Sequence, residues 1–205
     1  GGGRGARLVV PDREPIIRVR LVAPRDAGEV VVIGEEGDPL SLRVGDQDAI
    51  ESTGPIHVAR SGDGWNVHKG EQELVAGKSD EAIVITSRSA LRIQGAGDQS
   101  RSRRYSGRLH CEPLPDLDAA AWDLIEHVAM EDYIPGVLVG ELYEGWTDAC
   151  FASQAIAARS FACMEVQMRS HRHFDVMASP ASQAYVGVTD VKQAHDAQTR
   201  TEGMI

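Results

Sequence analysis

The chain has 205 residues, 42% of them apolar and 25% charged, which is a globular composition and excludes a wholly disordered, collagen-like or coiled-coil chain. The net charge of −10 is uneven, because residues 118–205 carry 5 Lys and Arg against 13 Asp and Glu. Because an acidic segment of this kind repels a polyanion, we do not expect nucleic acid as a partner. No stretch reaches the ~18 apolar residues of a membrane span.

Residues 15–117 have the pattern of short strands separated by turns. Ile17, Val19 and Leu21 alternate with arginines, which is the two-residue period of a half-buried strand. Turn signals such as Glu36-Gly37-Asp38-Pro39 divide this part. Further strands are predicted at 29–33, 40–44, 56–59, 64–68, 82–86, 91–94 and 105–111. We therefore expect an antiparallel sandwich or a barrel-like module.

A connector from Pro113 to Pro115 leads into a second part with a different pattern. The apolar run at 122–128 is too short to decide between strand and helix. A short helix is predicted at 131–139, with Pro135 near its first turn. The Ala-rich stretch at about 148–170 predicts one long, mostly buried helix.

Thr147 or Asp148 can cap this long helix.

A strand at 184–189 and a final short helix at 191–199 complete the predicted elements. The fold class is thus α+β, with a β-rich N-terminal part and a smaller helical part built on one long buried helix. We expect both parts to form one domain over residues 15–205, after an N-terminal tail at 1–14.

Polar residues and thiols of the predicted long helix need an explanation. Arg159 lies among small apolar residues, and a buried guanidinium needs a partner that the helix does not supply. Structural anchoring and the ordering of a site are equally open roles for it. Cys150 and Cys163 would lie about 20 Å apart along the helix and so cannot pair.

One block of sequence carries a recognisable motif. EDYIPGVLVGE at 131–141 is followed by Trp146 and by ASQAIAARS at 152–160. FDV at 174–176 and QAY at 183–185 come later. This series resembles the stage II sporulation protein D family, also called the amidase-enhancer family. Its core reads E-x-Y-[LI]-x-G-V-V-x-x-E-M-P, a Trp, A-x-x-A-Q-A-x-A-A-R-[TS], then D-V-C-D-x-x-H-C-Q-x-Y. The resemblance covers residues 15–205 and is specific from 131 to 185.

The resemblance implies a lytic transglycosylase of peptidoglycan. Such enzymes cleave the N-acetylmuramic acid–N-acetylglucosamine bond in strands stripped of stem peptides and leave a 1,6-anhydro end. By resemblance, Glu141 is the general acid and base. Because no water attacks, a second catalytic carboxylate is not required. The glutamate must hold its proton near neutrality, which apolar burial can arrange.

Further site residues follow from the same resemblance. Tyr143 and Trp146 can stack against sugar faces, although core packing is an open alternative for both. Gln183 and Tyr185 are expected to line the cleft. The full set of candidate substrate-binding residues is Tyr143, Trp146, Gln154, Arg159, Ser160, Gln183 and Tyr185.

The chain departs from the family pattern at two places. Leu142-Tyr143 replaces the Met-Pro that follows the acid. Met177, Ala181 and Ser182 replace the family's Cys, His and Cys, so we expect no zinc or disulfide at that loop, and no cofactor or metal in the site. The resemblance also implies that the domain continues beyond Ile205.

Three functions remain open from the sequence. The first is the transglycosylase, and the second is a non-catalytic wall-binding or amidase-stimulating module with a structural Glu141. The third is a β-rich scaffold without affinity for glycans. The expected partners are peptidoglycan strands and, for an amidase-stimulating module, a cell-wall amidase. Since peptidoglycan lies outside the cytoplasm, the resemblance implies export, although the 205 residues contain no recognisable signal or anchor.

Overall fold

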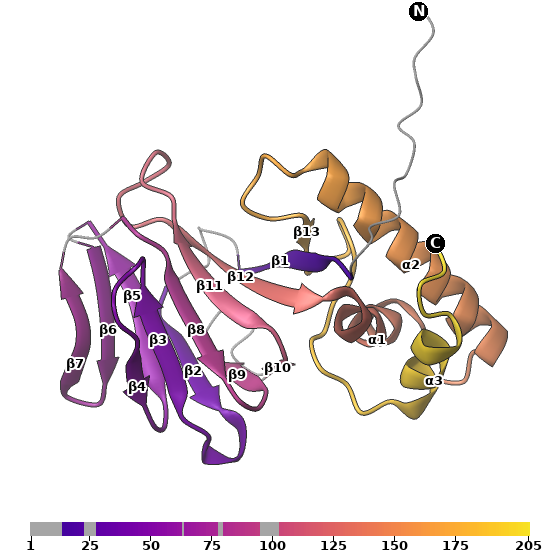
Figure 1. Ribbon diagram of the computed structural model, residues 1–205, viewed down its shortest axis with the longest axis horizontal. Helices are drawn as coiled ribbons and strands as arrows, with labels where there is room; N and C mark the ends of the chain where they lie inside the picture. The colour runs from indigo at the N-terminus through magenta and orange to yellow at the C-terminus, as the bar shows by residue number, and fades with distance from the viewer. Residues whose placement is uncertain (1–13, 23–27, 63, 78–79, 95–102) are drawn as a thin grey trace, which may run out of the picture.

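The computed structural model describes residues 14–22, 28–62, 64–77, 80–94 and 103–205, so the predicted tail at 1–14 lies outside it except for Glu14. Figure 1 shows the strands gathered at one end of the molecule and the helices at the other. The β-rich part contains β1 (Ile16–Val22), β2 (Val30–Gly34), η1 (Glu35–Gly37), β3 (Leu40–Val44), β4 (Ile50–Ser52), β5 (Ile56–Ser61), β6 (Gly64–Lys69), β7 (Gln72–Gly77), β8 (Ile83–Ser87), β9 (Leu91–Gln94), β10 (Arg103–Tyr105) and β11 (Arg108–Pro113). The second part contains β12 (Trp122–Ala129), α1 (Met130–Glu141), α2 (Asp148–Met168), β13 (Val176–Met177) and α3 (Lys192–Arg200).

The strands form two sheets that share an apolar core. One sheet has the order β13-β1-β12-β11-β8-β3-β4, and the other has the order β10-β9-β2-β5-β6-β7. Buried and partly exposed side chains alternate along β2, as expected for strands with one face on a core. Trp65 of β6 meets Trp122 of β12 edge to face, with 5.5 Å between ring centroids, and so joins the two sheets. The α+β class and the antiparallel β-rich part are confirmed.

Most of the predicted elements are confirmed within one or two residues at their ends. The ambiguous run at 122–128 is the strand β12, and the predicted strand at 105–111 is two strands, because the chain turns between β10 and β11. The prediction missed β4, β7 and the two-residue strand β13. The helix α1 begins at Met130, so Pro135 lies inside it rather than near its first turn.

The predicted strand at 184–189 is wrong, because this stretch has no ladder partner. Its backbone instead binds two other elements. Val186 N donates to Gly136 O of α1 at 3.3 Å, and Val188 N donates to Arg104 O of β10 at 2.7 Å. The apolar alternation that suggested a strand therefore belongs to a loop held between a helix and a sheet edge. We call residues 184–190 the crossing segment.

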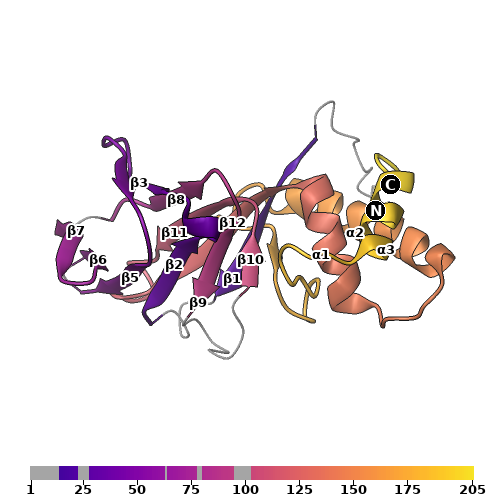
Figure 2. The same ribbon diagram turned by 90° about the horizontal axis from the view of Figure 1, so that it is seen from below.

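The helices are attached to the seven-stranded sheet through β1 and β12. Strand β12 continues directly into α1, and β1 pairs with β12 on one side and in parallel with β13 on the other. Arg18 of β1 binds the buried Asp175 carboxylate, with 2.6 Å between Nη2 and Oδ1, and also donates to the Arg169 carbonyl at the end of α2. Figure 2 shows the helices at the end of the molecule next to β1 and β12, with β12 running into α1. No helix of the described residues is long and apolar enough to cross a membrane.

Glu126 makes the stability of this framework dependent on pH. Its side chain is fully buried on β12, and Gly107 N donates to Oε1 at 2.9 Å. Burial raises its pKa to about 7, whereas an exposed glutamate titrates near ~4.3. The folded state therefore keeps a proton that the unfolded chain releases between these two values, and stability falls as pH rises through this window.

We predict that Glu126→Gln removes this loss. At about 1.4 kcal/mol per pKa unit, the unfolding free energy of wild type should fall by ~3 kcal/mol relative to that of the variant between about pH 4 and about pH 8, because the other titrating groups are common to both proteins. Urea unfolding across this range measures the difference. Glu51→Gln, at an exposed position on β4, is the control and should follow wild type. Equal pH slopes for wild type and Glu126→Gln would contradict the prediction.

Candidate functional site

Glu141 is the last residue of α1, and both of its carboxylate oxygens are held by donors. Gln154 Nε2 of α2 donates to Oε2 at 2.5 Å. Ala184 N of the crossing segment donates to Oε1 at 3.3 Å. The side chain is partly exposed. The structure thus brings two of the predicted site residues, Glu141 and Gln154, into direct contact and fixes the orientation of the carboxylate.

Two glycines of α1 make this arrangement possible. A Cβ on Gly140 would lie 1.9 Å from Ala184 O, and a Cβ on Gly136 would lie 2.4 Å from Gly187 O. The two glycines are one helical turn apart and so share one face of α1. The crossing segment packs directly on the helix backbone there, which brings Ala184 N within reach of Glu141. The motif contained both glycines, but their role depends on a loop whose position the sequence did not predict.

Two exposed aromatic side chains follow Glu141 in the loop between α1 and α2. Tyr143 is 75% exposed and Trp146 is 46% exposed, with their ring centroids 6.0 Å apart. The alternative that they are core residues is therefore wrong. Exposed aromatic rings in the loop that follows a carboxylate suit the apolar face of a sugar.

The aromatic loop is anchored on both sides. Gln193 Nε2 of α3 donates to Trp146 O at 3.0 Å and to Asp148 Oδ1 at 2.7 Å. Thr147 caps α2, with its Oγ1 accepting from Cys150 N at 3.3 Å, so this predicted cap is confirmed. The two aromatic side chains project from a backbone that is tied to α2 and α3.

Gln183 and Tyr185 lie in the interior, behind Glu141. Tyr133 Oη donates to Gln183 Oε1 at 3.0 Å, and Gln183 Nε2 donates to Ala158 O at 3.3 Å. The Tyr133 and Tyr185 rings are 4.8 Å apart. Burial raises the pKa of Tyr133, and the nearby Glu141 charge raises it further. Since both predicted residues are buried, they support the site from within, and their contact with a substrate stays a prediction.

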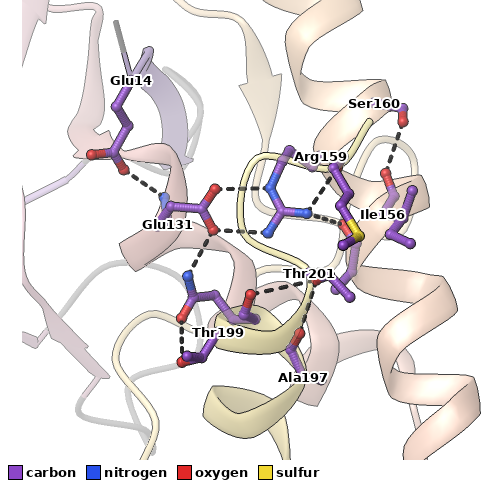
Figure 3. A network of polar contacts seen from close by, with 11 residues as sticks. Glu14, Glu131, Ile156, Arg159, Ser160, Ala197, Thr199 and Thr201 are labelled. Carbon is purple, nitrogen blue, oxygen red and sulfur yellow. Dashed lines mark hydrogen bonds and ion pairs between the residues drawn. The ribbon is translucent and has the colours of Figure 1, made fainter.

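Arg159 is held in a network that does not include Glu141 (Figure 3). Its side chain is only 2% exposed. Nε and Nη2 donate to the two oxygens of Glu131 at 2.9 and 2.8 Å, and Nη1 donates to Met204 O at 3.0 Å. The partner that the long helix could not supply is therefore the second residue of α1. These contacts support the anchoring role for Arg159, while a role in substrate binding stays a prediction.

Glu131 connects three elements through its side chain. Burial alone would raise the pKa of Glu131, but hydrogen bonds from Arg159 and Gln198 outweigh it and lower the pKa. Its backbone N donates to Glu14 Oε1 at 2.8 Å, which satisfies a free donor at the start of α1. The ion pair therefore joins α1 to α2, and the hydrogen bond from Gln198 adds α3 to the same carboxylate.

Ser160 and the cysteines make no hydrogen bond to Glu141 in the described part of the chain. Ser160 Oγ donates to Ile156 O, one turn earlier in α2, at 2.8 Å. Cys111 and Cys163 are buried, Cys150 is exposed, and all three are free. A role for Ser160 at the site stays a prediction.

A family model supports the resemblance that the motif suggested. The model of the SpoIID family, the stage II sporulation protein, matches residues 118–205. This match confirms the resemblance for the part of the chain that contains Glu141, Trp146 and Gln154, and it relates this part to a cell-wall-related sporulation family. Comparisons with curated proteins and with solved structures gave no significant match.

Gly140→Ala tests the close packing of the crossing segment on α1. We predict a loss of ~1–3 kcal/mol in unfolding free energy, the usual cost of overpacking, because the added Cβ would meet Ala184 O at 1.9 Å. Urea unfolding measures this loss, and amide hydrogen exchange should show faster exchange at Ala184. Gly62→Ala, whose Cβ would meet its nearest neighbour at 3.9 Å, should change neither. Unchanged exchange in Gly140→Ala would contradict the prediction.

Arg159→Met tests the anchoring role. We predict a loss of ~3–5 kcal/mol, because Glu131 would keep its charge without its ionic partner. Replacing both residues with Met should recover part of the loss. Arg172→Met, at an exposed position just after α2, is the control and should unfold like wild type. Thermal and urea unfolding measure the stability of all four proteins. An Arg159→Met variant as stable as wild type would contradict the anchoring role.

Proposed function

We propose that this protein is a lytic transglycosylase that cleaves peptidoglycan glycan strands, with Glu141 as the general acid and base. The observation that supports this best is one carboxylate, oriented by Gln154 and Ala184 N, that is followed in the chain by a loop with two exposed aromatic rings. The family match to residues 118–205 agrees with a substrate in the cell wall.

In the first step, Glu141 gives its proton to the oxygen that links C1 of N-acetylmuramic acid to N-acetylglucosamine. The C1–O bond breaks, N-acetylglucosamine leaves with a free hydroxyl, and positive charge develops at C1. Tyr143 and Trp146 hold sugar rings by stacking on their faces, which places the glycosidic oxygen against the carboxyl group.

In the second step, the Glu141 carboxylate takes the proton of the C6 hydroxyl of the same sugar. O6 bonds to C1 and closes the 1,6-anhydro ring, and Glu141 regains the proton it gave. No water is consumed, so one carboxyl group completes the cycle. Gln154 and Ala184 N keep the carboxyl group in the orientation that both transfers need.

A non-catalytic role in wall binding or amidase stimulation is the second candidate. The exposed Tyr143 and Trp146 favour it, because two aromatic rings can hold a glycan without any reaction. The replacement of the family's Met-Pro by Leu142-Tyr143 directly after the acid also favours it. Either candidate places the protein where peptidoglycan is, so we propose that it acts in the cell envelope or outside the cell, with glycan strands as its partner.

Glu141→Gln separates the two candidates. Glycan strands stripped of stem peptides are incubated with each protein, and mass spectrometry identifies the ends, since an anhydro end is about 18 Da lighter than a hydrolysed one. We predict anhydro products from wild type and a loss of ~10²–10⁴-fold in rate in the variant, with glycan binding retained.

Glu144→Gln is the matched control, because Glu144 is exposed in the same loop; it should keep full activity. Hydrolysed ends instead of anhydro ends would exclude the transglycosylase. Glycan binding without products from any protein, reduced in Tyr143→Ala and Trp146→Ala, would support the binding module instead.

A further inference from the structure

Two histidines and a glutamate meet on the six-stranded sheet, outside the site described above. His57 of β5 and His68 of β6 are direct partners in the antiparallel ladder, so both side chains point to the same face. Glu29 precedes β2 and comes to the same face, because the ladder pairs Val31 with His57 and side chains two residues apart share a face. The neighbours Val30, Val58 and Val67 point into the core, so the three polar side chains lie on the outer face.

The side chains are close enough to act on one ligand. A ligand atom of each lies within 4.8 Å of a ligand atom of the other two. His57 Nδ1 is 2.8 Å from Glu29 Oε1, and the two imidazole rings are stacked with 4.8 Å between centroids and 16° between planes. Paired strands fix the backbone of both histidines, and Glu29 directly precedes β2, so little ordering is needed to bring the three side chains together.

We propose that Glu29, His57 and His68 bind a divalent transition-metal ion, with Zn²⁺ as the best-suited ion. Two imidazoles and a carboxylate are a zinc ligand set, with metal–ligand distances of about 2.0–2.2 Å. Ligands at that distance lie ~3–4 Å from one another, so small side-chain rotations from the present positions are enough. The side chains are partly exposed, which leaves an entry path for the ion.

An ion pair alone does not account for this arrangement. A bond between Glu29 and His57 would explain those two residues, but it leaves His68 without a function. Within the described residues the His68 side chain makes a ring contact with His57 and no hydrogen bond. Glu73 of β7 is the exposed ladder partner of His68 but does not belong to the group of three, so water supplies the fourth position of the proposed site. The proposed metal site is independent of the function proposed for Glu141.

Calorimetric titration of the metal-free, tag-free protein with Zn²⁺ tests the site. We predict one equivalent bound by wild type, and an affinity at least about tenfold lower in His57→Gln, His68→Gln and Glu29→Gln, since even losing a second-shell partner costs about 10–100-fold. Zn²⁺ should also raise the melting temperature of wild type and not that of the variants. Co²⁺ in place of Zn²⁺ should give the intense visible absorption of four-coordinate cobalt.

His171→Gln and Cys150→Ser are the controls, because both residues are exposed potential ligands in the helical part. Both variants should bind Zn²⁺ like wild type. Binding that survives in all three site variants, or that is lost in a control, would place the metal elsewhere and overturn the proposal. Absence of binding in wild type would overturn it as well. Glu29 lies before β2 and is exposed, so Glu29→Gln keeps the test valid if a histidine variant does not fold.

Discussion

The contact between Gly140 and the backbone of Ala184 is the constraint on which the candidate site depends. Any side chain at position 140 would overlap Ala184 O, so only glycine lets the crossing segment approach α1 this closely. That approach places Ala184 N at Glu141 Oε1, while Gln154 binds the other oxygen. A carboxylate held from two sides has one orientation, and an acid that must give and then take a proton in one geometry needs that restriction.

A second interaction keeps the helices in register with one another. The Arg159–Glu131 pair joins α1 to α2 near the opposite end of α1 from Glu141, and Gln198 adds α3 to the same carboxylate. Within one short helix, Glu131 therefore holds the helices together, whereas Glu141 presents its side chain toward the surface. This division explains why two glutamates and an arginine from one sequence block have different environments, although the block resembles a single motif.

The strands of the sandwich and the long helix could be predicted because local patterns determine them. Buried and more exposed residues alternate along Leu40–Val44 and Leu91–Gln94. The Ala-rich helix is preceded directly by its N-cap residue, Thr147. The motif likewise indicated Glu141, and the sequence placed Gln154 on the neighbouring helix. The crossing segment could not be predicted, since its alternating residues resemble a strand while its backbone binds Gly136 and Arg104. The burial of Gln183 and Tyr185 depends on that same long-range contact and so escaped the sequence as well.

The crossing segment also explains why the β-rich part matters to a site that lies in the helical part. Val188 N binds Arg104 O, and Arg103 Nη1 of the same strand donates to Tyr185 O at 3.3 Å. The segment that supplies Ala184 N to Glu141 is therefore fixed at its other end by β10, the edge strand of the six-stranded sheet. Although the family match begins at residue 118, the position of the Glu141 carboxylate depends on a strand that precedes it. The sandwich thus contributes to the geometry of the site and not only to the stability of the chain.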